Sequence, residues 1–118
     1  MIVVNRQGVI NLINHVTQVH IGRIYSPEAE AHTPSIQILR KPEMAWAIDT
    51  FARCITTNDT HWLSLLVEEV QTIDARIARD TRITWEDEIR VYAKQTSRQT
   101  ALLVYLVHMA VNNKHITL

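Results

Sequence analysis

Apolar residues recur every three or four positions from residue 5 to residue 21, which is the spacing of one face of a helix. Asn5 can cap the start of this helix, and Gly22 can end it. The second half of the segment is also rich in strand-forming residues, so an extended conformation stays open there. The residues of the expected apolar face are Val9, Leu12, Ile13, Val16 and Val19.

Residues 23–42 contain all three prolines of the chain. The stretches Ser-Pro-Glu and Thr-Pro-Ser each place a polar residue before a proline, which is how a short helical turn begins. The run Ile-Gln-Ile-Leu at residues 36–39 is compatible with a brief extended piece. We expect an irregular but ordered connection that covers part of the core.

Two further helices have clear apolar faces. One is expected to begin at Pro42 and end at Thr56, and the next to run from the polar cluster at residues 56–60 to about Asp80. The apolar face of the first contains Met44, Ile48, Phe51 and Ile55. That of the second contains Trp62, Leu66, Val70, Ile73 and Ile77.

The last helix is expected to begin after Thr84, which with Asp87 has the spacing of a capping box. Its apolar pattern continues from Trp85 to about Asn112 if the helix is unbroken, and a break near Ser97 is the alternative. The pattern over the whole chain predicts a single all-α domain spanning residues 1–118. We expect a compact bundle of four principal helices, with the irregular proline-punctuated segment between the first and the second.

The final part of this last helix, residues 97–113, has almost no polar side. Leu102, Leu106 and Met109 form a second apolar stripe beside the one that faces the bundle. A helix that is apolar on two sides needs two partners, and the second is either the proline-punctuated segment or another copy of the chain. Both terminal helices are nearly uncharged, which favours another copy. We therefore predict a homodimer that self-associates through Leu102, Leu106 and Met109.

Composition narrows the class of protein further. The two glycines and three prolines are fewer than a sandwich or barrel with many tight turns would need. Twelve basic residues balance twelve acidic ones, so no overall field attracts nucleic acid or an anionic membrane. No apolar run approaches the roughly 20 residues of a membrane helix, and we expect no membrane partner. The single Cys54 and the lack of a secretory signal favour a cytoplasmic location.

No motif for catalysis, a cofactor, a metal or a small-molecule ligand stands out in the sequence. His15 and His20 would lie roughly 140° apart on a helix, and neither the Glu-x-x-His nor the His-Glu-x-x-His spacing occurs. Cys54 lies at the margin of an apolar face, where cysteine behaves as a small hydrophobic residue. We predict no catalytic residue, no cofactor and no bound metal.

Trp46 is out of place on its helix, because it lies with Asp49 and Arg53 on the side away from the apolar face. An outward tryptophan beside an arginine is typical of the centre of a protein interface. The alternative is that residues 23–41 fold over Trp46. We predict that Trp46, Asp49 and Arg53 contact a partner protein.

These features predict a small non-catalytic regulatory or adaptor protein that acts through protein–protein contacts as a homodimer. The leading alternative is a DNA-binding regulator with a divergent helix-turn-helix at residues 77–98, whose basic edge is Arg90, Lys94 and Arg98. The acidic run at residues 86–88 counts against it, because it would face phosphate. A single sequence also leaves open an enzyme whose site is assembled from dispersed residues.

Overall fold

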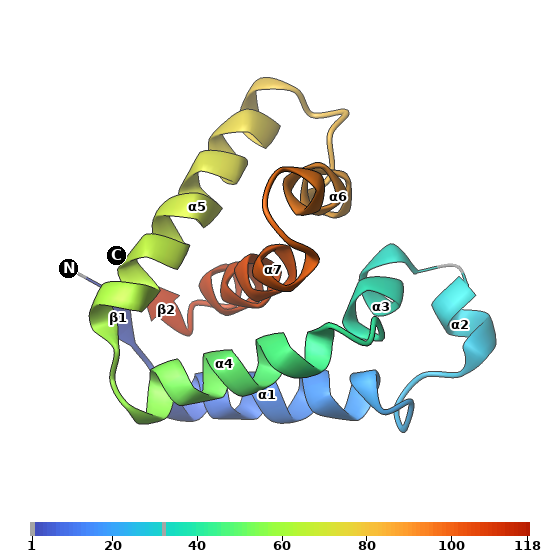
Figure 1. The fold of residues 1–118 in the computed structure, drawn as a ribbon, viewed down its shortest axis with the longest axis horizontal. Coiled ribbons are helices and arrows are strands. Elements are labelled where there is room, and N and C mark those ends of the chain that lie inside the picture. The colour runs from blue at the N-terminus through green and yellow to red at the C-terminus, as the bar shows by residue number, and fades with distance from the viewer. Residues whose placement is uncertain (1, 32) are drawn as a thin grey trace.

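The computed structural model describes residues 2–31 and 33–118, and helices dominate this part of the chain (Figure 1). The all-α class predicted from the sequence is confirmed, with two short strands added. The helices are α1 (Arg6–His20), α2 (Pro27–Ala31), α3 (Pro34–Leu39), α4 (Met44–Thr56), α5 (Thr60–Arg79), α6 (Trp85–Gln95) and α7 (Arg98–Asn112). The strands are β1 (Val3–Val4) and β2 (Ile116–Thr117), which pair antiparallel.

Helix α7 is the central element of the fold. It contacts α1, α4, α5, α6 and β2, and Figure 1 shows it enclosed between α5 and α4. Eight of its 15 residues are buried. The segment is apolar on nearly all sides because several helices of the same chain pack around it.

This packing corrects the assignment of the second apolar stripe to a dimer surface. Leu102 and Leu106 are only 1% and 2% exposed in the single chain, and Met109 is partly buried against the same core. Side chains so fully covered by their own chain do not present a surface to a second copy. The second partner of α7 is therefore the rest of its own fold.

Of the two alternatives for the last helix, the structure shows the one with a break near Ser97, because the helix is interrupted at Thr96 and Ser97. Thr96 has φ −121° and ψ −102°, outside the helical region, and Ser97 is extended with φ −145° and ψ 157°. The Ser97 hydroxyl accepts a hydrogen bond from the Thr100 amide at 3.0 Å and so caps α7. The break lets α6 fold back against α7 instead of extending it.

The proline-punctuated segment is more helical than expected. The Ser-Pro-Glu and Thr-Pro-Ser stretches do begin short helices, α2 and α3, but residues 36–39 belong to α3 and are not extended. Ile36, Ile38 and Leu39 are buried, and α3 contacts both α1 and α6. The segment thus covers part of the core, as expected.

The two ends of α1 follow the sequence prediction closely. The Asn5 side chain accepts a hydrogen bond from the Gly8 amide at 3.1 Å, and α1 is helical to His20 without an extended half. Gly22 follows in the left-handed region with φ 78°, a conformation that glycine adopts without strain. The His20 Nδ1 atom lies 2.8 Å from the Leu39 carbonyl oxygen, which ties the end of α1 to α3.

Helices α4 and α5 confirm most of their predicted faces, with one error. Helix α4 begins at Met44 rather than Pro42, and its predicted apolar residues are buried or partly buried. On α5, Trp62 is 40% exposed, whereas Leu63 and Val67 are buried. The buried face of α5 is set by its contact with α7, and this contact turns Trp62 outward.

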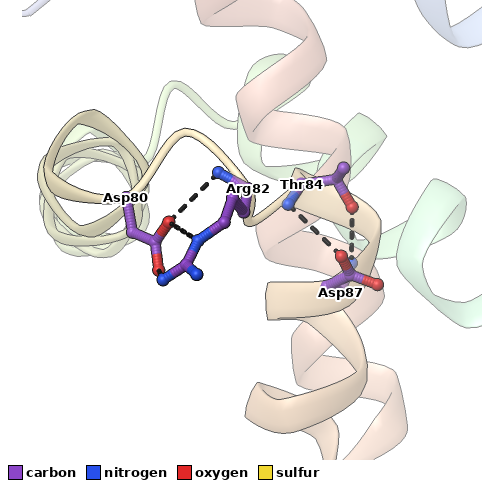
Figure 2. Close-up of polar contacts among 4 residues, drawn as sticks. All are labelled: Asp80, Arg82, Thr84 and Asp87. Atoms are coloured by element: carbon purple, nitrogen blue, oxygen red, sulfur yellow. Dashed lines mark hydrogen bonds and ion pairs between the residues drawn. The ribbon is translucent and has the colours of Figure 1, made fainter.

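The turn between α5 and α6 is held by two local networks (Figure 2). The Asp80 carboxylate accepts hydrogen bonds from the Arg82 amide at 3.1 Å and from its Nε at 2.9 Å. The predicted capping box is confirmed: Thr84 Oγ1 accepts from the Asp87 amide at 3.1 Å, and Asp87 accepts from the Thr84 amide at 3.3 Å. These contacts define the direction in which α6 leaves the turn.

Candidate functional site

The predicted partner-binding residues lie together on the outer side of α4. Trp46 is 40% exposed, so the described part of the segment 23–41 leaves much of this side chain open. Asp49 and Arg53 are both exposed, and the Arg53 guanidinium pairs with the Asp49 carboxylate one turn away. An exposed indole therefore lies on the same helix side as a fixed pair of opposite charges.

This side of α4 continues into a groove at the start of α5. The groove has a volume of about 310 Å³, and Trp62 is one of its lining residues. Its α4 wall contains Thr50 and Arg53, which follow Trp46 at helical spacing. We call the surface made by Trp46, Asp49, Thr50, Arg53 and Trp62 the α4 face. The sequence prediction missed Trp62 because the periodicity placed it on the buried side of α5.

Cys54 also lines this groove, but its thiol has low reactivity. It is a free, buried cysteine. Burial raises the pKa of the Cys54 thiol, and the nearby Asp59 carboxylate raises it further. A thiol with a raised pKa stays protonated near neutral pH, so Cys54 is a poor nucleophile.

A second hollow lies between α6, α7 and the end of α3, with a volume of about 360 Å³. Its floor is apolar and includes Ile38, Ile89 and Leu102. We call it the basic pocket, because its lining contains four cationic residues and no acidic one. The four are Lys41, Arg90, Lys94 and Arg98.

Two of the four cations have acidic partners just outside the lining. Arg98 pairs with Glu43 at 3.2 Å, and Arg90 pairs with Asp87 at 3.3 Å. Lys41 and Lys94 form no ion pair within residues 2–31 and 33–118. The basic pocket therefore keeps an excess of positive charge.

The Glu43 carboxylate lies at the edge of the basic pocket and is ionised. A hydrogen bond from its own backbone lowers the pKa of Glu43, against the effect of desolvation, and Arg98 and Lys41 lower it further. Its Oε1 accepts from Arg98. Its Oε2 is buried and has no hydrogen-bond donor among the described residues.

The three acidic residues at the start of α6, residues 86–88, form contacts within the chain. Glu86 accepts a hydrogen bond from the Tyr105 hydroxyl at 3.2 Å, and Asp87 belongs to the capping box. Glu88 is buried and lies 3.5 Å from the Arg76 guanidinium. Glu86 therefore connects α6 to α7 and Glu88 connects it to α5, whereas Asp87 caps α6 itself.

An aromatic cluster completes the junction of α5, α6 and α7. The Trp85 indole stacks on the His108 ring, with centroids 3.8 Å apart, and its Nε1 donates to Asp74 at 2.9 Å. Burial lowers the pKa of His108, although Asp74 and Glu86 act in the opposite direction. Burial raises the pKa of the Tyr105 hydroxyl. The His108 ring and the Tyr105 hydroxyl are therefore neutral near pH 7, which is compatible with a structural contact.

The described residues contain neither a metal site nor a membrane-spanning helix. Within residues 2–31 and 33–118, no group of three or more His, Cys, Asp and Glu side chains is arranged to hold a metal ion. In the same part of the chain, every helix is too short or too polar to cross a membrane.

The structure thus offers two surfaces, the α4 face and the basic pocket. The sequence alone predicts Trp46, Asp49 and Arg53 as partner-binding residues on the first, and Arg90, Lys94 and Arg98 as a basic edge on the second. It missed Lys41, since nothing in the sequence places this residue beside a helix that begins more than forty positions later. No family model, no curated protein and no solved structure matches this chain.

Proposed function

We propose that this chain is a small non-catalytic regulatory or adaptor protein that acts through protein–protein contacts. We propose further that its first partner is a second copy of the chain, bound through the α4 face. The observation that carries the proposal is the exposure of Trp46, at 40%, beside the ion-paired Asp49 and Arg53. Tryptophan and arginine are the residues most enriched at the energetic centres of interfaces. The opposite side of α4 packs on the core, so the helix holds these side chains in place.

The arrangement of charges favours a second copy as the first partner. A two-fold axis between Asp49 and Arg53 would bring each carboxylate close to the guanidinium of the other copy. The same surface therefore complements itself, with one ion pair on each side of the axis. Trp46 and Trp62 would supply the apolar contact around them.

A charge-swap experiment tests this dimer. The Asp49→Arg variant carries two cations at these positions and Arg53→Asp carries two anions, so each alone should be monomeric by light scattering at micromolar concentration. An equimolar mixture restores both ion pairs across the axis and should recover the dimer mass. Gln71→Arg, on an exposed position of α5, is the control and should leave the mass unchanged.

Two results would overturn the dimer. One is a wild-type mass equal to a single chain at the same concentration. The other is a wild-type dimer in which both charge variants still dimerise alone, because the interface would then lie elsewhere. Circular dichroism of each variant verifies that a monomeric mass does not come from unfolding.

A further inference from the structure

We propose that the basic pocket is a ligand site for a small amphipathic anion, meaning a carboxylate or phosphate head joined to a short apolar body. The pocket volume of about 360 Å³ is within the range of about 300–1,000 Å³ that small-molecule sites occupy. It does not overlap the α4 face, so this site is separate from the proposed dimer.

The apolar lining of the basic pocket favours a ligand that has an apolar body. Ile38, Ile89 and Leu102 come from α3, α6 and α7, and all three are part of the core. Because the chain already covers these three side chains, the apolar surface open to a ligand belongs mainly to Ala93 and to the methylene stems of Lys41, Lys94 and Arg98. An apolar body that covers this surface is removed from water together with it, which is the main source of affinity in such sites. A free inorganic anion would gain nothing from this floor.

The rim selects the charge of the head group. Lys94 lies on the rim without an ion pair among the described residues, and Lys41 interacts with Glu43 only at longer range. Arg98 shares only its Nη1 with Glu43. Ammonium and guanidinium donors form charge-assisted hydrogen bonds with carboxylate and phosphate oxygens. An anionic head held between these groups would balance the excess charge described above.

A bound ligand would also tie together segments that are distant in sequence. Lys41 and Ile38 belong to the region around the end of α3, whereas the other cations belong to α6 and α7. A ligand that binds only the folded chain raises its stability in proportion to the logarithm of ligand concentration over Kd. Thermal stability therefore reports binding without any assumption about activity.

The experiment compares probes that share one apolar body. Octanoate and octyl phosphate should bind and raise the Tm of the full chain in a saturable way, whereas octanol and octylamine should bind at least tenfold more weakly. The comparison of the first two shows whether the site prefers a carboxylate or a phosphate head. Titration calorimetry measures each Kd.

Substitutions at the rim are expected to change the affinity for octanoate in opposite directions. Lys94→Ala and Lys41→Ala should each weaken octanoate binding about tenfold, while Glu43→Gln should strengthen it, because that change removes a competing carboxylate from Arg98. Arg79→Ala removes an exposed cation at the far end of α5 and should leave the Kd unchanged. Ala93→Phe narrows the pocket and should abolish binding while the chain stays folded.

Three results would overturn the proposal. Octanol that binds as well as octanoate would show a purely apolar hollow. Octanoate binding that Lys41→Ala, Lys94→Ala and Ala93→Phe leave unchanged would lie elsewhere. Failure of all four probes, together with salt-dependent binding of duplex DNA that Lys94→Ala weakens, would favour the DNA-binding alternative at residues 77–98.

Discussion

Helices α6 and α7 are neighbours in the sequence, separated only by Thr96 and Ser97, but different interactions hold them in place. Helix α7 buries eight of its 15 residues, whereas α6 buries only Glu88 and Ile89. Helix α6 is positioned instead by its capping box, by the contact of Glu88 with Arg76, and by the stacking of Trp85 on α7. Apolar packing defines the centre of this fold, and polar and aromatic contacts attach the helix at its flank.

The largest effect should come from the core of α7. Leu103 is fully buried, and Leu103→Ala should lower the free energy of unfolding by about 2–5 kcal/mol through lost apolar contacts and a cavity. The matched change on α6 is Val91→Ala, at an exposed position, which should alter stability by less than about 0.5 kcal/mol. Urea denaturation measures both. Equal losses would mean that the two helices do not differ as described.

The break between the two helices should have an intermediate effect. Ser97→Ala removes the N-cap of α7 and should cost about 1 kcal/mol. Ser97→Asp keeps an acceptor at the same position and should restore most of this stability. Gln99→Ala, at an exposed position in the first turn, is the control. A neutral Ser97→Ala variant would show that tertiary packing alone places the break.

The contact between Trp85 and His108 joins the two helices, and it predicts that the stability of the fold depends on pH. The pKa of His108 in the folded chain is below the ordinary value of 6.5, so the unfolded chain takes up a proton first as the pH falls. The stability that His108 contributes is complete above about pH 6.5 and is lost as the pH falls toward its folded-state pKa. His108→Phe should flatten this part of the stability profile, measured by urea denaturation from pH 7.5 to 5. A profile of unchanged slope would contradict the burial of a neutral ring.

The smallest effect is expected at the turn before α6. The Asp80–Arg82 ion pair is exposed, and water and salt screen such pairs, so Arg82→Ala should leave the denaturation midpoint unchanged within error. Thr84→Ala in the adjacent capping box should lower stability by about 1 kcal/mol. If Arg82→Ala were the more damaging change, the ion pair rather than the cap would define the start of α6.

The features that the sequence predicted well are local ones. The Asn5 cap, the left-handed Gly22 and the capping box of Thr84 and Asp87 each depend on residues within a few positions of one another. Their chemistry is therefore visible in a short stretch of sequence.

The features that the sequence did not predict depend on which elements meet in space. Trp62 follows the helical period but faces outward, because the face of α5 that is buried contains Leu63 and Val67 instead, and α5 packs on α7. The apolar pattern also continues across Ser97, so periodicity alone does not reveal that the chain turns back there. The basic pocket needs Lys41 and Lys94 side by side, and only the packing of α3 on α6 brings them together.

The short pairing of β1 with β2 has a consequence for the order of folding. Val3 pairs with Thr117, so this contact encloses nearly the whole chain, and Figure 1 shows the two ends side by side. Closing so long a loop is entropically unfavourable until the helices between the ends have packed, which makes the strand pair a late event. A substitution there, such as Val4→Ser, should accelerate unfolding in stopped-flow experiments and leave the refolding rate unchanged. We therefore expect the strand pair to affect how long the native state lasts, and the helices to affect how quickly it is reached.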